Sequence, residues 1–219
     1  MNTAISKSKY TRSDIPIAGC LPPLIASYTA EDSRGNKELF DEYILLIEQQ
    51  IDDVDLFLVE TMSSMKEIIV VTDALDHFGL GKYVSLTLDD DYPNLLRSGE
   101  NLVDAIKLLE MKSADAILLN CSCPETISSA LTKFKNIDIP FGAYANGFSS
   151  VKDLKFGKSV NVLEARNDLG PDEYLKFVMD WISKGARIIG GCCEIGPKHI
   201  NRVSDQLHLN GYTTMKLRL

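Results

Sequence analysis

Cysteine residues gather where the apolar runs of this chain end. Cys192 and Cys193 follow two glycines at the end of the stretch ARIIGGCC, and Cys121 ends the stretch AILLNC. Neighbouring side chains on a strand point to opposite faces, so core packing alone does not require two adjacent cysteines at one bend. Gly190 and Gly191 would let the backbone turn so that both following sulfurs face one point. The pattern predicts a site that uses sulfur.

Three thiolates at one rim of a sheet would serve as metal ligands. Zn²⁺ binds cysteine sulfur at about 2.3 Å and keeps one coordination position open in catalytic sites. Cys121, Cys192 and Cys193 could supply three ligands if their strands meet. The open position would accept a substrate thiol, which coordination deprotonates, and that thiolate could attack an electrophilic carbon. Alternatively, the cysteine pair is a small buried apolar element, or the metal site is structural.

The cysteine count and the charge balance narrow the class of protein. The chain has 219 residues, five cysteines and a formal net charge of -8. An odd number of cysteines, two of them adjacent, is poorly suited to a disulfide framework and indicates a reducing compartment, so we expect a cytoplasmic protein. Without a basic stripe, the acidic chain is not expected to bind nucleic acid or an anionic membrane. Residues 1–14 lack the apolar region of a secretory signal and are predicted to form a disordered or flexible tail.

The elements that must position these cysteines alternate regularly along the chain. Six apolar or β-branched runs each precede a segment with helical periodicity. The predicted strands cover residues 15–19, 55–61, 82–88, 116–121, 140–146 and 186–193. The predicted helices cover about 36–52, 63–78, 99–112 and 124–134, and two more begin near 171 and 196. Strict alternation predicts one α/β domain, residues 15–219, with a parallel sheet that is either a (β/α) barrel or an open doubly wound sheet.

Polar residues also stand at the predicted strand ends, where both architectures place their functional sites. Glu60 is interpreted as a substrate contact rather than a helix cap. Asn120 and Asn146 either orient a substrate or satisfy loop backbone. Cys20 and Cys123 are weaker candidates for a direct role. His199, at the start of the last helix, is interpreted as a structural partner of the cysteine loop, and the acidic residues 89–92 as a solvated loop.

Several motifs resemble those of one family, in the same order along nearly the whole chain. The stretch GGCCEIGPKHI resembles the C-terminal signature of the homocysteine S-methyltransferase family, in which Gly-Gly-Cys-Cys is followed by Gly-Pro-x-His-Ile. IAGCLPP resembles the family's third-strand motif, DLFLVET its fourth, and LRSGE the loop after its fifth. ILLNCSCPETI resembles the sixth and YANG the seventh.

This resemblance implies a zinc-dependent (β/α)₈ barrel that transfers a methyl group to the sulfur of homocysteine and so forms methionine. The donor would be a sulfonium or quaternary ammonium compound: S-methylmethionine, S-adenosylmethionine or a betaine. Carried over position by position, the zinc ligands would be Cys121, Cys192 and Cys193. Glu60 would hold the amino group of homocysteine, and the other predicted substrate contacts are Thr61, Asn120 and Asn146.

The chain also departs from the family's pattern. The family begins with a strand that bears Asp-Gly-Gly and a second strand with a polar end, whereas this chain starts at what resembles strand three. About six of eight units are recognisable, so we expect an incomplete or rearranged barrel with two unpaired sheet edges. A homo-oligomer or a complementing chain could cover them. The alternative function is therefore a non-catalytic zinc- or thiol-binding subunit that needs a partner chain. A redox protein is a third and weaker hypothesis, since the cysteine pair lacks Cys-x-x-Cys spacing.

Overall fold

This computed structural model describes residues 15–154 and 160–213 of the chain. They form one parallel sheet with helices beside it. The predicted tail at residues 1–14 lies outside that part. The strands are β1 (Ala18–Leu21), β2 (Leu56–Met62), β3 (Tyr83–Leu86), β4 (Ala116–Asn120), β5 (Phe141–Tyr144) and β6 (Ile188–Ile189). The helices are α2 (Asn36–Glu48), α3 (Met65–His77), α4 (Leu102–Met111), α5 (Pro124–Ala130), α6 (Pro171–Ser183) and α7 (Pro197–Leu209), with 3₁₀ turns η2 (Leu131–Phe134) and η3 (Val160–Val162). None of the described helices is both long enough and apolar enough to cross a membrane.

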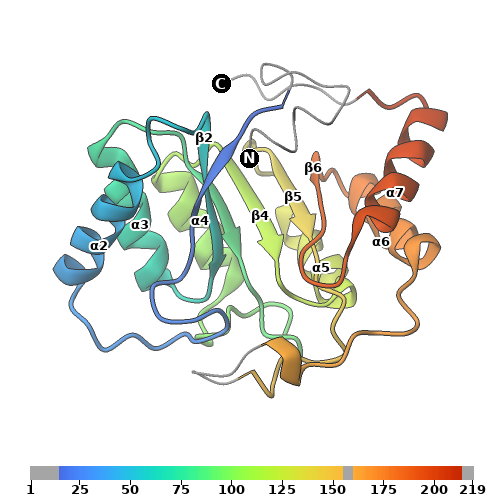
Figure 1. Cartoon of the computed structure of the whole chain (residues 1–219), viewed down its shortest axis with the longest axis horizontal. Helices are drawn as coiled ribbons and strands as arrows, with labels where there is room; N and C mark the ends of the chain where they lie inside the picture. Colours follow the sequence, from blue (N-terminus) through green and yellow to red (C-terminus); the bar gives the residue numbers. More distant parts are fainter. Residues whose placement is uncertain (1–14, 155–159, 214–219) are drawn as a thin grey trace.

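Strand order decides between the two expected architectures. All six strands are parallel and lie in sequence order from β1 to β6. A doubly wound sheet reverses its strand order at one point, and this sheet does not. Right-handed crossovers that always step in one direction place the helices on one face, as in a barrel. The (β/α)-barrel type is therefore confirmed, and Figure 1 shows α2 and α3 beside one end of the sheet and α6 and α7 beside the other.

The sheet has two free edges within the described residues. There β1 pairs only with β2, and β6 pairs only with β5. This agrees with the expectation of an incomplete barrel plan with two unpaired edges.

The pleat of the strands separates apolar residues from polar ones. Val59, Val84 and Ile117 stand in register on neighbouring strands and are buried in the apolar core. The alternate positions project to the opposite face, which is the interior in a closed barrel. This inner face carries the polar residues Glu60, Ser85, Asn120 and Tyr144. The same alternation that builds the core thus presents the candidate site residues.

The strands at the two edges differ from their predicted bounds. β1 begins at Ala18 rather than at residue 15, because Pro16 has no N–H for a strand ladder. β6 contains only Ile188–Ile189, whereas the prediction covers residues 186–193. The backbone nevertheless continues beside β5, since the Cys192 N–H donates to the Ala145 carbonyl at 2.9 Å.

Local side-chain chemistry sets where the helices begin. Ser64 and Glu67 form a capping box at the start of α3: the Glu67 N–H donates to Ser64 Oγ at 3.3 Å, and the Ser64 N–H donates to Glu67 Oε2 at 3.0 Å. Pro124 opens α5 at a position where a missing N–H costs nothing. α3 begins at Met65, just after β2 ends at Met62, and α5 begins at Pro124, just after β4 ends at Asn120, so these two loops are short.

Gly142 is required for the close approach of β5 and β6. A Cβ at this position would lie 1.9 Å from the Ile188 carbonyl oxygen. We expect Gly142→Ala to lower the free energy of unfolding by about 3 kcal/mol, the upper end of ordinary overpacking. Gly35→Ala is the control, because its Cβ would meet nothing within 4 Å; it should cost at most about 1 kcal/mol, as alanine does at a helix N-cap. Urea denaturation followed by circular dichroism measures both, and equal losses would contradict this reason for the glycine.

Candidate functional site

Three cysteine sulfurs lie together at the carboxyl end of the sheet. Cys121 directly follows β4, and Cys192 and Cys193 follow β6. Cys121 Sγ lies 2.8 Å from Cys192 Sγ, which lies 3.9 Å from Cys193 Sγ. The structure thus brings together the three cysteines that the sequence singles out, across a separation of 71 residues.

Residues with left-handed backbone surround this sulfur cluster. The φ angles are 69° at Tyr28, 65° at Thr61, 49° at Cys121 and 64° at Glu194. Such a conformation costs a non-glycine residue roughly 1–3 kcal/mol and is concentrated at functional sites. Four strained residues around three sulfurs therefore support a functional interpretation of this end of the sheet.

The two glycines before the cysteine pair act through close packing. The left-handed residue that makes the turn is Glu194, after the cysteines, and neither glycine has a positive φ. A Cβ at Gly191 would lie 2.3 Å from Ile195 Cγ2, and one at Gly190 would lie 3.2 Å from Tyr144 Cβ. The predicted turn at the glycines is thus replaced by a turn one residue after the pair, with the glycines making room for it.

Hydrogen bonds within the cluster divide the three thiols into two kinds. A hydrogen bond from Cys192 lowers the pKa of Cys121, and further hydrogen bonds from Thr61, at 3.6 Å, and from Tyr28 act in the same direction. The hydrogen bond from Cys192 also lowers the pKa of Cys193 to about 6. Cys192 has a raised pKa because its proton is held by Cys121 and Cys193. Two of the three sulfurs therefore favour the thiolate, the form that binds metals.

The donor set suits a zinc ion, although one distance must change on binding. Tetrahedral ligands at about 2.3 Å from zinc stand roughly 3.8 Å apart, and the separation of 3.9 Å between Cys192 and Cys193 meets this requirement. The 2.8 Å between Cys121 and Cys192 is too short. Within residues 15–154 and 160–213, no group of three or more His, Cys, Asp or Glu side chains is already arranged to hold a metal ion. Metal binding therefore requires the Cys121 and Cys192 sulfurs to separate by about 1 Å.

Glu60 is held from two sides on the inner face. Cys20 Sγ donates to Glu60 Oε2 at 3.0 Å, and the Tyr144 hydroxyl lies 3.3 Å from Oε1 and 2.6 Å from Ser85 Oγ. Burial and then the hydrogen bond to Glu60 raise the pKa of Cys20 to about 12. Burial and then the Glu60 charge raise the pKa of Tyr144. Both groups thus stay protonated as donors, and the carboxylate lies near enough to the cluster to act on Cys193.

Two asparagines near the cluster each keep one buried polar atom without a partner in the described residues. Asn120 and Asn146 are each 1% exposed, and the unpartnered atoms are Asn120 Oδ1 and Asn146 Nδ2. Asn120 Nδ2 donates to Thr61 Oγ1 at 2.8 Å, and Asn146 Oδ1 accepts from the Phe148 N–H at 3.1 Å. Because leaving such groups unpaired is costly, these two atoms are places where a ligand would supply the missing hydrogen bonds.

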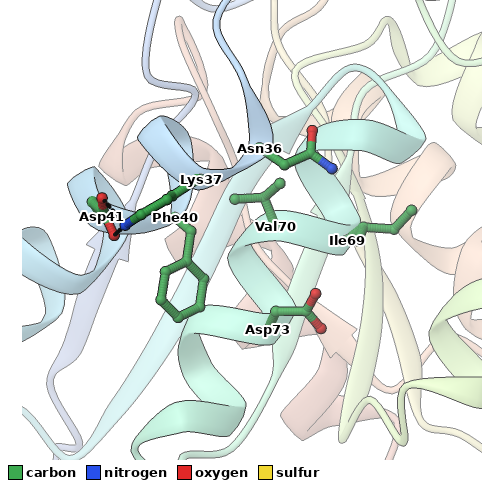
Figure 2. Close-up of a pocket in the computed structure, with 7 residues that line it drawn as sticks. All are labelled: Asn36, Lys37, Phe40, Asp41, Ile69, Val70 and Asp73. Carbon is green, nitrogen blue, oxygen red and sulfur yellow. Dashed lines mark hydrogen bonds and ion pairs between the residues drawn. The ribbon is translucent and has the colours of Figure 1, made fainter.

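Two hollows lie in different parts of the molecule. One of about 270 Å³ borders the strand-end loops and is lined by Asn146, Cys123 and Asp90, among others. A larger one of about 410 Å³ lies in the outer layer between α2 and α3, where Phe40 and Val70 line it (Figure 2). The larger hollow contains no strand-end residue, whereas the smaller one borders the carboxyl end of the sheet and is lined by Asn146, one of the two asparagines with an unpartnered atom.

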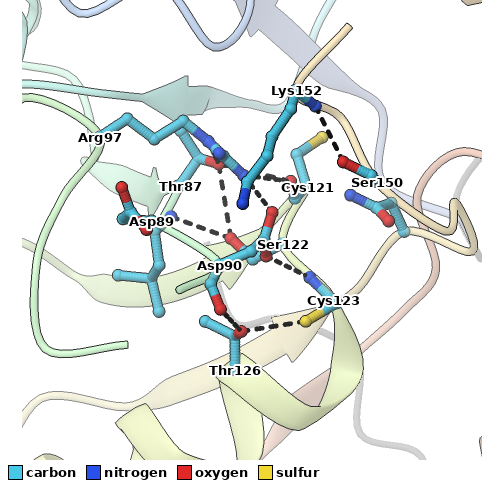
Figure 3. A network of polar contacts seen from close by, with 12 residues as sticks. Thr87, Asp89, Asp90, Arg97, Cys121, Ser122, Cys123, Thr126, Ser150 and Lys152 are labelled. Carbon is cyan, nitrogen blue, oxygen red and sulfur yellow. Dashed lines mark hydrogen bonds and ion pairs between the residues drawn. The ribbon is translucent and has the colours of Figure 1, made fainter. Parts of the chain in front are cut away.

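In the acidic loop after β3, Asp90 joins two loops, whereas Asp91 and Tyr92 are exposed. Asp90 Oδ2 lies 2.9 Å from Arg97 Nη2, and Asp90 Oδ1 accepts from the Cys123 N–H at 2.9 Å (Figure 3). Asp91 pairs with Lys152 across the cavity mouth at 2.5 Å. The prediction for residues 89–92 is thus wrong for Asp90, because a carboxylate that caps one loop and pairs with an arginine of another is not free in solvent.

Two other candidates have structural partners. The Cys123 thiol lies 2.9 Å from Thr126 Oγ1, and burial raises its pKa. His199 Nδ1 accepts from the Gly196 N–H at 3.2 Å, and Nε2 lies 3.0 Å from the Leu169 carbonyl. These contacts agree with a structural role for His199 at the start of α7.

Three residues of the site were missed by reasoning from the sequence: Tyr28, Arg97 and Tyr144. Tyr28 lies in a segment without helix or strand, residues 22–35, and has no periodic neighbours that would indicate a role. Tyr144 stands two residues before Asn146, on the same strand as the candidate motif, and strand alternation could have placed it on the inner face.

The pKa values of the thiols predict which cysteine reacts first. In reduced, metal-free protein at pH 7, iodoacetamide should label Cys193 before Cys20, because the Cys193 pKa is lowered to about 6 and the Cys20 pKa is raised to about 12. The labelling rate at Cys193 should reach half its maximum near pH 6 and level off about one pH unit higher, since the thiolate is the nucleophile. Peptide mapping by mass spectrometry measures both rates. Faster labelling of Cys20, which is the more exposed thiol, would contradict the hydrogen-bonding pattern.

Comparisons with known proteins agree on one family. The model of the family described as homocysteine S-methyltransferase matches residues 2–207. The chain is 33% identical over 161 residues to the betaine-homocysteine S-methyltransferase of Drosophila melanogaster, covering 67% of this chain and 45% of that protein. It is 30% identical over 111 residues to homocysteine S-methyltransferase 1 of Arabidopsis thaliana, covering 50% of this chain and 33% of that protein. The chain thus spans less than half the length of these relatives.

A solved structure supports the fold. The metallated form of the homocysteine methyltransferase MmuM from Escherichia coli matches with a TM-score of 0.69 at 20% identity, covering 88% of this chain and 61% of that one. At this level of identity the likeness concerns the fold, and it agrees with the barrel order of the six strands.

Proposed function

The chain belongs to the homocysteine S-methyltransferase family, and from this premise we propose that it transfers a methyl group to the thiol of homocysteine. The C–S bond of methionine forms as the bond between the methyl carbon and an onium sulfur or nitrogen breaks. The thiol proton passes to solvent before the attack, and the onium atom of the donor keeps the electron pair of the broken bond and so loses its positive charge. The observation that supports this proposal most strongly is the cluster of three cysteine sulfurs at the strand ends.

Zinc is the proposed cofactor, with Cys121, Cys192 and Cys193 as its ligands. When bound, zinc would favour the thiolate form of a coordinated substrate thiol near neutral pH. The chain's own part is to present two sulfurs that favour the thiolate form and to hold them at the ends of β4 and β6, on one rim of the sheet. Thr61 and Tyr28 donate hydrogen bonds to Cys121, which orients that sulfur, as partners around a metal site orient its ligands.

The substrate contacts follow from charge and from unpartnered atoms. Glu60 would bind the ammonium group of homocysteine, because its carboxylate is fixed by Cys20 and Tyr144 and acts on Cys193. Asn120 Oδ1 would accept and Asn146 Nδ2 would donate a hydrogen bond to a substrate. Thr61 would act through its contacts with Asn120 and Cys121.

A methyl-transfer assay tests the proposal. The purified, reduced protein with equimolar zinc is incubated with homocysteine and, in turn, S-methylmethionine, S-adenosylmethionine and glycine betaine carrying a ¹³C-labelled methyl group. We expect labelled methionine, detected by mass spectrometry, with at least one donor and none when homocysteine is replaced by homoserine. No labelled methionine with any of the three donors, in a protein that has bound zinc, would contradict the proposed reaction.

A second candidate function is a non-catalytic zinc- or thiol-binding subunit completed by a partner chain. The observation that favours it is the pair of free sheet edges at β1 and β6 within the described residues. Such edges present unpaired backbone groups that another chain can cover. Light scattering after size-exclusion chromatography, run over a range of concentrations, would show a concentration-dependent assembly in this case. Methyl transfer by the monomer would exclude it.

A further inference from the structure

Arg97 contacts three separate parts of the chain around the sulfur cluster. Its guanidinium carbon lies 4.7 Å from the centre of the Tyr28 ring. Nη2 pairs with Asp90 Oδ2 at 2.9 Å and lies 3.4 Å from the Cys121 carbonyl oxygen. Nε lies 3.1 Å from Thr87 Oγ1 (Figure 3). The side chain is 12% exposed, so its charged group is largely shielded from solvent.

The segment that carries Arg97 is itself well anchored. Two bridges, Leu88 with Leu96 and Leu95 with Asn101, fold the loop after β3 back on itself. Leu88 and Leu96 are fully buried, and the Ser98 N–H donates to the Ser63 carbonyl at 3.0 Å. Arg97 is therefore presented from a fixed base.

Neither regular secondary structure nor a favourable backbone conformation fixes the position of Tyr28. It lies in residues 22–35, which form no helix or strand, and its φ of 69° is unfavourable for a tyrosine. Yet its hydroxyl hydrogen-bonds Cys121. A cation above an aromatic face is attracted to the ring, most strongly where water is excluded, and the Arg97 guanidinium is in that position.

We propose that Arg97 is a positioning residue of the sulfur cluster, which holds the Tyr28 ring so that its hydroxyl donates to Cys121 and holds the Cys121 peptide in its left-handed conformation. The peptide contact has two parts, because the Cys121 carbonyl accepts from Arg97 Nη2 and from Thr87 Oγ1, each at 3.4 Å. The Arg97 charge is already paired with Asp90, so its role is geometric. The proposal rests on the proposed function in so far as the cluster is a metal site.

A double-mutant cycle on zinc affinity tests whether Arg97 acts through the Tyr28 hydroxyl. Competition with a chromophoric chelator is measured for the wild type, Arg97→Lys, Tyr28→Phe and the double variant. Lysine keeps the charge but not the planar fork, and phenylalanine keeps the ring but not the hydroxyl. We expect each single variant to bind zinc about tenfold more weakly, as for other partners of metal ligands. The double variant should lose clearly less than the product of the two single losses, because both changes remove the Tyr28 hydrogen bond and only Arg97→Lys also weakens the contact with the Cys121 carbonyl. A product of about a hundredfold, or no loss in Arg97→Lys, would overturn the proposal.

A second measurement needs no metal. Hydrogen exchange of residues 22–35, followed by mass spectrometry in metal-free protein, should become several-fold faster in Arg97→Lys and stay unchanged in Tyr28→Phe, which keeps the ring. Arg202→Lys is the matched control, since Arg202 pairs with Asp172 on the outer helices, and it should change neither readout. Unchanged hydrogen exchange in Arg97→Lys would overturn the proposal that Arg97 holds the Tyr28 ring in place. If the wild type bound no zinc, the proposed function would fail, whereas the exchange result would still decide the role of Arg97.

Discussion

A chain in which Cys193 is replaced by serine should purify without zinc, whereas the wild type should carry about one zinc per chain. Serine removes the sulfur whose pKa is lowered to about 6, and so one of the two that favour the thiolate. Two remaining thiols, 2.8 Å apart, leave too few ligands for a stable tetrahedral site. Methyl transfer to homocysteine should fall by about 10³-fold or more, since a catalytic metal contributes several kcal/mol of charge stabilisation.

Cys123→Ser is the matched control for this experiment. Cys123 lies two residues from Cys121 but bonds to Thr126 at 2.9 Å instead of to the cluster. This variant should keep its zinc and most of its activity. Metal content is measured by inductively coupled plasma mass spectrometry on freshly reduced protein. If zinc were retained in Cys193→Ser, or lost equally in both variants, the assignment of the sulfur cluster as the metal site would be contradicted.

The substitution Glu60→Gln should raise the KM for homocysteine by about 10- to 100-fold, because a hydrogen bond to a charged group contributes about 1.5–3 kcal/mol. Glutamine keeps the size of the side chain and can still accept from one of Cys20 and Tyr144, which donate to different oxygens of the Glu60 carboxylate. What it lacks is the negative charge that would bind the ammonium group. The value of kcat should change less than KM, since this contact is made equally in the ground state and in the transition state.

A substrate analogue separates this role from a general disturbance of the site. 4-Mercaptobutyrate has the thiol and the carboxylate of homocysteine but no amino group. The wild type should use it poorly, and Glu60→Gln should use it about as well as the wild type does. Steady-state kinetics with both thiols measures the difference. An equal loss for both substrates would mean that Glu60 supports the fold of the inner face, through Cys20 and Tyr144, and does not bind the amino group.

Much of the fold was predictable because its signals are local. Hydrophobic periodicity located all six strands and the helices between them, and the observed bounds differ mainly at β1 and β6. The cysteines were identifiable for a similar reason: adjacent cysteines at a strand end, behind two glycines, are visible in a short stretch of sequence. Their pairing with Cys121 was predictable only through the rule that parallel strands end at one rim.

The tertiary structure decided the strand order, the geometry of the sulfurs and the partners of Glu60. Sequence alternation is the same for a barrel and a doubly wound sheet, and only the pairing of β1 through β6 in order separates them. Cys20 and Tyr144, which hold Glu60, lie 40 and 84 residues from it. Tyr28 reaches Cys121 from a segment without regular structure, under Arg97. Such contacts carry no periodic signal in the sequence, because they depend on which loops the packing of distant elements brings together. That packing is a property of the whole chain rather than of any one stretch.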